Sequence, residues 1–145
     1  MNTKHWTDLL VRLNACPEAV EWARGYRSLA AAWAACERGD WMLWLAGRVS
    51  GRPGSKSRRL VVLAAADCAA TAEWYVPAGE TRPAECVGLC QRYGRGDAGV
   101  TLAMVRAAGA AAWAAGAAAV AAALPDHADI VRGHYPRAPR MRRAP

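Results

Sequence analysis

Residues suited to acid–base chemistry are few in this sequence, and the most conspicuous is a carboxylate in an apolar stretch. Asp67 lies within VVLAAADCAA, and Glu73 follows six positions later. Two carboxylates in a shared apolar setting would suit general acid–base catalysis. A buried carboxylate needs a partner, so we expect a structural ion pair between Asp67 and an arginine of a neighbouring helix, with Arg48 or Arg106 best placed. A catalytic role for Asp67 is the alternative.

Metal ligands and catalytic dyads are only weakly indicated. Cys86 and Cys90 are four residues apart and would share a helical face, but no CxxC or HxxxH pair completes a zinc site. We expect the five cysteines to be buried thiols. His127 and His134 have aspartates nearby, which leaves an Asp–His dyad open, although exposed or capping histidines are the simpler expectation. We expect neither a metal nor a cofactor.

Recognition of an acidic partner is indicated more strongly, because the formal net charge is +7. The segment GRPGSKSRR contains Arg52, Lys56, Arg58 and Arg59. It lacks the glycine spacing of a phosphate-binding Walker loop, so we interpret it as a basic loop. The last ten residues, PRAPRMRRAP, contain four arginines and no acid. Such clusters attract acidic proteins and nucleic acids alike, and nucleic-acid binding through Arg52, Lys56, Arg58, Arg59 and the arginine tail is one alternative function.

The stretch WMLWL at 41–45 is the most concentrated apolar segment. On a helix, Trp41, Trp44 and Arg48 share one face. A helix that is apolar nearly all round is mostly buried, but a partly exposed Trp would be a strong anchor for a partner protein. We therefore predict that Trp41, Trp44 and Arg48 bind a partner together with the basic residues of the following loop, Arg52, Lys56, Arg58 and Arg59.

The elements that must position these residues are all predicted to be helices, because no alternating strand pattern occurs. Residues 1–135 should form one compact all-α domain, and residues 136–145 a disordered Arg/Pro-rich tail. Gly25 is a weak point in the second helix, and Asp40 and Ser57 are the expected N-caps of the third and fourth. The six to seven predicted helices cover about 3–13, 17–36, 41–49, 58–75, 82–93 and 100–124, with a last piece from 126.

Residues 107–125 form an uncharged, alanine-rich run. Its length would permit a membrane span, but alanine contributes little to insertion, so we expect a packed helix and no membrane partner. Gly109 and Gly116 are seven residues apart and predict a stripe that a neighbouring helix approaches closely. The N-terminal residues do not resemble a signal peptide, which favours a cytoplasmic protein with reduced thiols.

Three segments stand out beside the alanine-rich helix: AWAACERGDWMLWLAGR, RRLVVLAAADCAA and ADIVRGHYP. Together they resemble a bacterial family of immunity proteins, the Imm-five-like domain, and the resemblance covers most of residues 15–136. The resemblance implies an all-helical domain encoded near toxin genes or in phage genomes, without a catalytic motif. The positions that match the family signature are Asp40, Trp41, Met42, Trp44, Arg59, Asp129, Ile130, Arg132 and Pro136.

We therefore expect a non-catalytic protein that neutralises a partner, either a toxin or a host defence complex, by occluding its surface. The basic charge favours a partner with an acidic surface, unlike inhibitors of nucleases, which are commonly acidic. The alternatives are a phage inhibitor of the anti-CRISPR type, a basic nucleic-acid-binding protein, and an enzyme in which Asp67 has a perturbed pKa.

Overall fold

The computed structural model describes residues 5–113 and 124–141, and within these ranges it is all-helical, as predicted. It divides into more helices than expected, because the predicted second helix is two. The helices of the described part are α1 (Asp8–Arg12), α2 (Pro17–Arg24), α3 (Leu29–Ala35), α4 (Gly39–Val49), α5 (Lys56–Ala70), the 3₁₀ helix Glu73–Tyr75, α6 (Arg82–Gly94), α7 (Leu102–Trp113) and α8 (Leu124–His134).

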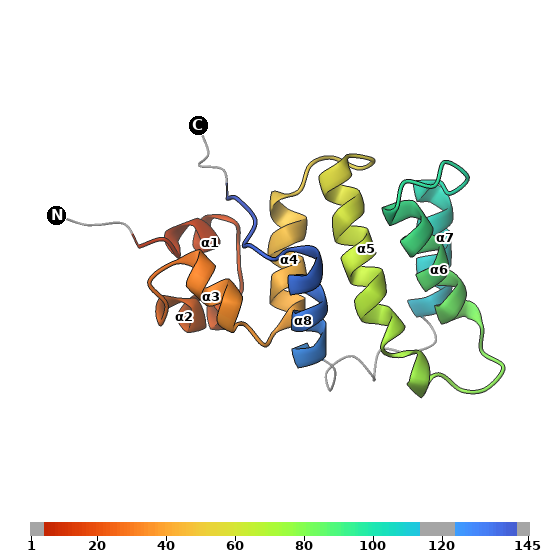
Figure 1. Cartoon of the computed structure of the whole chain (residues 1–145), viewed down its shortest axis with the longest axis horizontal. Helices are drawn as coiled ribbons and strands as arrows, with labels where there is room; N and C mark the ends of the chain where they lie inside the picture. Colours follow the sequence, from red (N-terminus) through yellow and green to blue (C-terminus); the bar gives the residue numbers. More distant parts are fainter. Residues whose placement is uncertain (1–4, 114–123, 142–145) are drawn as a thin grey trace.

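The helices follow one another along the long axis of the molecule, except for the last (Figure 1). Helices α1–α3 form one end, α4 and α5 the middle, and α6 with α7 the other end. Helix α8 returns to the middle and packs against both α4 and α5. Residues far apart in the sequence therefore meet in the centre of the protein.

Local signals explain where most helices begin and end. Pro17 occupies the first turn of α2, where its missing N–H costs nothing, and Gly25 ends that helix as the sequence suggested. The side chain of Ser28 then accepts a hydrogen bond from the N–H of Ala31 at 3.2 Å and starts α3. The turn between α2 and α3 is thus set by a glycine and a cap within a few residues.

Two predicted caps are wrong. Ser55, not Ser57, caps α5, accepting from the N–H of Arg58 at 3.2 Å. Asp40 lies in the first turn of α4, which begins one residue earlier at Gly39. Its carboxylate accepts hydrogen bonds from the side chain of Arg38 instead of serving as the N-cap.

The buried core joins the N-terminal helices to α8. Its cluster includes Trp33 of α3, Met42 and Leu45 of α4, and Val131 of α8. The indole N–H of Trp33 donates to the carbonyl of Tyr135 at 3.0 Å, which satisfies its one polar atom. Residues 136–141 are described, and Ala138 and Met141 among them pack against this cluster, so the predicted disorder of the tail is not confirmed there.

The close helix contacts rest on glycines other than the predicted stripe. A Cβ on Gly39 would lie 2.5 Å from the Cβ of His127 and 2.7 Å from the backbone N of Ala128. A Cβ on Gly109, by contrast, would meet nothing within 4 Å among the described residues. The stripe is therefore wrong at Gly109, and Gly116 lies outside the described residues.

The predicted helix over 100–124 is described only as α7, because 114–123 lie outside the described residues. Val120 and most of the alanine-rich run fall in this gap. Within the described ranges, no helix has the length and apolarity needed to cross a membrane.

We predict that Gly39→Ala destabilises the protein by about 1–3 kcal/mol, because the added methyl overpacks the contact between α4 and α8. Alanine is the better helix former, so propensity alone predicts the opposite sign. The free energy of unfolding from urea titration measures the effect. The matched control is Gly88→Ala in α6, where a Cβ meets nothing within 4 Å. This substitution should leave the free energy of unfolding equal or higher. Equal stability of Gly39→Ala and the native protein would show that α4 and α8 do not pack this closely at Gly39.

Candidate functional site

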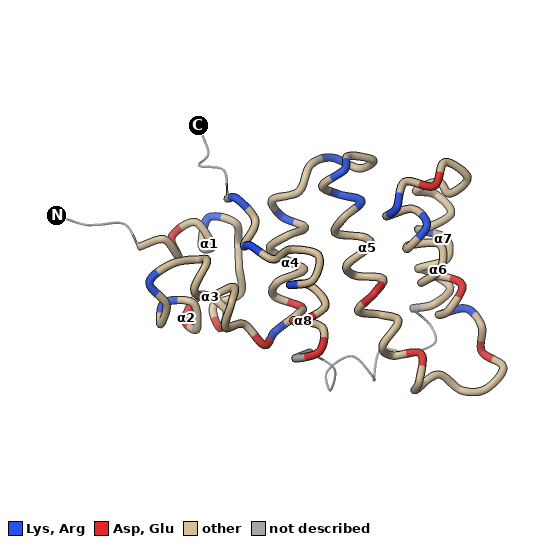
Figure 2. The backbone as a smooth tube through the Cα atoms, in the orientation of Figure 1, with Lys and Arg blue, Asp and Glu red and all other residues tan. Residues whose placement is uncertain are grey.

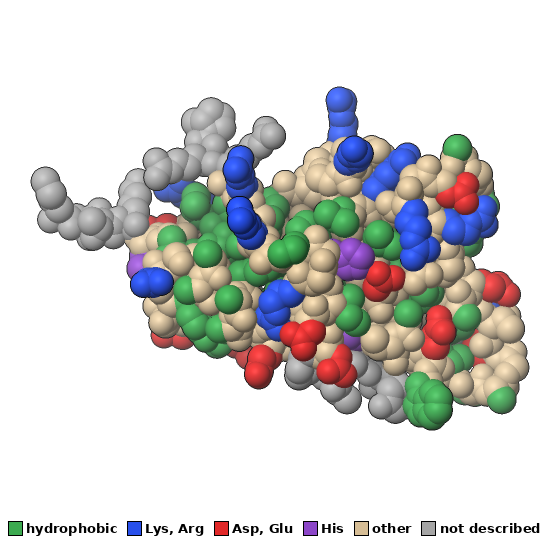
Figure 3. Space-filling model, viewed as in Figure 1, with side chains coloured by type: hydrophobic (Ala, Val, Ile, Leu, Met, Phe, Trp, Pro, Cys, Tyr) green, Lys and Arg blue, Asp and Glu red, His purple; other side chains and the backbone are tan. Residues whose placement is uncertain are grey.

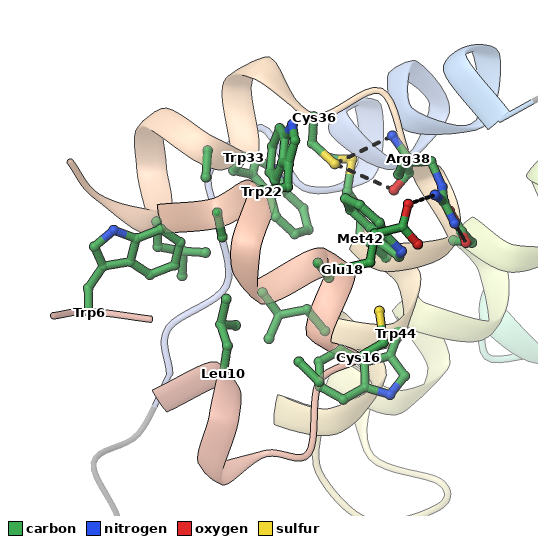
Figure 4. A pocket seen from close by; sticks show the side chains of 18 of the residues that line it. Trp6, Leu10, Cys16, Glu18, Trp22, Trp33, Cys36, Arg38, Met42 and Trp44 are labelled. Atoms are coloured by element: carbon green, nitrogen blue, oxygen red, sulfur yellow. Dashed lines mark hydrogen bonds and ion pairs between the residues drawn. The ribbon is translucent and has the colours of Figure 1, made fainter. Parts of the chain in front are cut away.

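A cavity of about 520 Å³ lies among α1, α2, α3 and α4 (Figure 4). Its volume and its mainly apolar walls are typical of pockets that bind ligands. The lining includes five of the seven tryptophans, which come from different elements: Trp6, Trp22, Trp33, Trp41 and Trp44. We call this feature the tryptophan-lined cavity.

The cavity has an exposed mouth and a buried floor. Asn14, Cys16 and Glu18 line it and are exposed, whereas Leu10 and Met42 line it and are buried. Helix α4 contributes to both the mouth and the floor, because its half-buried Trp41 and Trp44 alternate with buried positions. An apolar group entering from solvent would therefore pass polar side chains first and then contact mainly apolar surface.

The aromatic walls are held by one another and by hydrogen bonds. The rings of Trp22 and Trp41 lie 5.8 Å apart between centroids, tilted by 56°, and the ring of Tyr26 lies 4.7 Å from that of Trp22. The indole N–H of Trp6 donates to the carbonyl of Tyr26 at 2.8 Å. Tilted aromatic pairs of this kind stabilise each other, so the walls are fixed before anything binds.

The charged rim is organised by Arg38, in the short loop between α3 and α4. Its Nε and Nη2 donate to the two carboxylate oxygens of Asp40 at 2.9 and 2.7 Å, and its Nη1 lies 3.7 Å from Glu18. The guanidinium also sits 4.2 Å above the ring of Trp41. The hydrogen bonds from Arg38 lower the pKa of Asp40 and those to Asp40 raise the pKa of Arg38. The rim is thus a fixed ion pair beside an aromatic wall.

The residues predicted to bind a partner fall into two places. Trp41 and Trp44 line the cavity, and Arg48 lies 5.9 Å from the ring of Trp44 and donates to the carbonyl of Leu13 at 2.9 Å. Arg52, Lys56, Arg58 and Arg59 do not line it. They belong to the α4–α5 loop and the first turn of α5.

The predicted arginine partner of Asp67 is wrong. Its Oδ2 lies 2.7 Å from Nε2 of His134, and its Oδ1 accepts from the amide of Gln91 at 2.9 Å. The packing of α8 against α5 places His134 there, half-buried and neither exposed nor capping. The Asp–His pair left open by the sequence therefore exists, but neither side chain lines the tryptophan-lined cavity.

The expectation that His127 is exposed or caps a helix is also wrong, because the residue is buried. Its Nε2 lies 2.9 Å from the hydroxyl of Thr71. The missed signal is one of spacing: Asp67 and Thr71 are four residues apart on α5, and His127 and His134 seven apart on α8, so each pair shares one face. Two polar faces on apolar helices would have predicted that α5 and α8 meet.

The cysteines are not all buried thiols. Cys36 and Cys68 are buried, but Cys16 is exposed at the mouth of the cavity. Burial raises the pKa of Cys68 to about 11. Burial, with a smaller contribution from Cys86, also raises the pKa of Cys90 to about 11. Within the described part of the chain, no three His, Cys, Asp or Glu residues are placed to hold a metal ion.

Comparison with models of known protein families, with curated proteins and with solved structures gives no match. The resemblance to the Imm-five-like domain therefore stays a prediction.

We predict that iodoacetamide at about pH 8 alkylates Cys16 in the folded protein well before Cys36 or Cys68. The reason is that Cys16 is exposed, whereas burial both shields the other two and raises their pKa. Peptide mapping by mass spectrometry identifies the modified sites. A urea-unfolded sample, in which all three should react, is the control. Alkylation of Cys36 or Cys68 as fast as Cys16 would contradict the prediction.

We also predict a pH-dependent contribution from Asp40. Because its pKa in the folded protein is lowered from 3.8, the pair with Arg38 stabilises the fold fully above about pH 4, and this stability is lost as pH falls through the lowered pKa. The pair is largely exposed, so the contribution should be below about 1 kcal/mol. Urea titrations near pH 6 and pH 3 measure the free energy of unfolding at each pH. The difference between the two values should be smaller for Asp40→Asn than for the native protein. An equal difference would contradict the prediction.

Proposed function

We propose that this protein is a non-catalytic binding domain that accepts the apolar side chains of a partner protein in its tryptophan-lined cavity. The partner, a toxin or a host defence complex, would be neutralised because the bound domain covers its working surface. The observation that carries the proposal is the cavity itself, with an open mouth, an apolar floor and aromatic walls fixed by hydrogen bonds.

The distribution of polar groups favours a protein partner over a small metabolite. A small polar ligand needs several unpaired polar groups that converge on it. Here the rim charges of Glu18, Arg38 and Asp40 already pair with one another, and the thiol of Cys36 bonds to the carbonyl of Arg38 at 3.5 Å. Binding would therefore depend on shape and on desolvation of aromatic surface, as at the hot spots of protein interfaces.

Charge supports a partner whose apolar side chains are flanked by carboxylates. The net charge of +7 attracts acidic surfaces over long distances, and Arg48 is exposed next to Trp44. An arginine in this position pairs readily with a carboxylate at the edge of the contact. Catalysis is not part of the proposal, because the pair of Asp67 and His134 does not line the tryptophan-lined cavity.

The experiment is selection of a displayed random-peptide library on the folded protein, followed by affinity measurements with one synthetic selected peptide. We expect large apolar residues next to Asp or Glu. Ala19→Leu should weaken binding at least about tenfold, or 1.4 kcal/mol, because Ala19 is half-buried in the cavity wall and the larger side chain fills it.

The matched control is Ala34→Leu, the same substitution at an exposed position of α3 that does not line the cavity. It should bind the peptide as the native protein does. The same two variants test whether binding neutralises the partner. A protein captured by the native chain and by Ala34→Leu, but not by Ala19→Leu, should lose its own activity when bound. Selected peptides that bind Ala19→Leu equally well would refute the proposal.

A further inference from the structure

The predicted partner-binding residues that do not line the cavity lie at a basic edge of the molecule. We define the basic edge as residues 50–59 and 92–99, which contain six cationic side chains and one carboxylate, Asp97. Figure 2 shows Lys and Arg gathered at the ends of α5 and α6 on one side of the molecule. In Figure 3 basic side chains follow the upper margin of the visible face, while most acidic ones lie below.

The fold builds this edge by ending α4 and α6 where α5 begins. Arg58 and Arg59, adjacent in the first turn of α5, extend to opposite neighbours. The Nε of Arg58 donates to the carbonyl of Gly51 at 3.2 Å, and the guanidinium of Arg59 lies 5.4 Å from the ring of Tyr93 in α6. The two side chains thus continue the positive charge from the α4–α5 loop to the end of α6.

Most of this charge is not neutralised within the protein. Arg92 pairs with Asp97 at 2.8 Å, but the other five cations of the edge have no carboxylate within 4.0 Å among the described residues. The Nε of Arg59 is buried and has no hydrogen-bond partner in the same part of the chain. A helix C-terminus attracts cations such as Arg92 and Arg95, but it does not account for Arg52 in the loop or for Lys56 at the start of α5.

We propose that the basic edge binds the phosphate backbone of a nucleic-acid duplex. Packed helices lie about 8–10 Å apart, so the edge from the α4–α5 loop to the end of α6 spans roughly 16–20 Å, over which one strand of a duplex presents about five or six phosphates. This site is separate from the tryptophan-lined cavity and goes beyond the proposed function.

The composition of the edge favours a duplex over the other polyanions. Single strands are held by stacking of their bases on aromatic rings, but Tyr93, the aromatic residue of the edge, is buried. A protein interface needs large apolar anchors, whereas the rest of the edge consists mainly of Gly, Ser, Arg and Lys. Charge without anchors or stacking platforms suits phosphate contacts, which do not depend on base sequence.

The test measures binding of a fluorescein-labelled DNA duplex by anisotropy, between about 50 and 200 mM NaCl. The edge variant carries Arg52→Gln, Lys56→Gln and Arg95→Gln, three exposed cations whose side chains form no hydrogen bond or ion pair among the described residues. We expect at least about tenfold weaker binding, and a plot of log affinity against log salt that is shallower by about three, one for each lost phosphate contact.

Two variants with the same loss of charge are the controls. Arg12→Gln, Arg24→Gln and Arg27→Gln remove three exposed cations from the opposite end of the molecule, and Arg140→Gln, Arg142→Gln and Arg143→Gln remove three from the C-terminal segment. Both should keep most of the affinity and nearly the full salt slope. Ala19→Leu should bind the duplex normally, which separates this test from that of the cavity.

Three outcomes would overturn the inference. One is the absence of salt-dependent duplex binding by the native protein. Another is a loss in either control variant as large as that in the edge variant. The third is tighter, edge-dependent binding of polyglutamate or of phosphatidylserine vesicles than of the duplex, which would assign the edge to an acidic protein or a membrane surface. Unchanged circular dichroism and unfolding midpoints must accompany the edge variant's loss, because unfolding would otherwise explain it.

Discussion

The side chain of Arg132 connects helix α8 to the end of α3, and the rim of the tryptophan-lined cavity depends on that connection. From α8 it donates to the carbonyls of Cys36 at 2.6 Å and Trp33 at 3.2 Å, while it also pairs with Asp129. Carbonyls at the end of a helix have no partner within that helix, so one guanidinium completes the end of α3. The loop that follows carries Arg38, and its conformation sets the rim of the tryptophan-lined cavity. An arginine far away in the sequence thereby shapes a site to which it does not itself belong.

The cavity and the basic edge differ in composition. Five of the seven tryptophans gather where α1–α4 meet, whereas six of the nineteen Lys and Arg residues lie at the basic edge beyond the end of α4. Arg48 lies at the boundary, next to Trp44. An aromatic surface acts only at contact, whereas charge acts over a Debye length of about 8–10 Å. The two surfaces would therefore act differently on the partners proposed for them, the edge over a distance and the cavity only in contact.

Features that depend on neighbours in the sequence were predictable, and features that depend on packing between distant helices were not. Pro17 marked the beginning of α2 correctly, and Gly25, predicted only as a weak point in a helix reaching residue 36, is where α2 ends. The apolar run at 41–45 correctly indicated a mostly buried helix. The partners of Asp67 were wrong, because His134 reaches it only through the return of α8. The close-contact glycine was misassigned for the same reason: periodicity selected Gly109, but the approach of α8 makes Gly39 the constrained one. Ser55 and Ser57 are equivalent as caps by type, and the geometry of the loop decided between them.

The hydrogen bond from Trp33 to the carbonyl of Tyr135 has a consequence for the order of events during synthesis. Most of the cavity wall is translated early, but the backbone that supports Trp33, and the apolar residues behind it, belong to the final helix and the segment that follows it. A nascent chain that has emerged only as far as α7 therefore lacks the support of its own pocket. Translation must therefore pass α8 and the segment up to Met141 before the walls of the cavity have their full support.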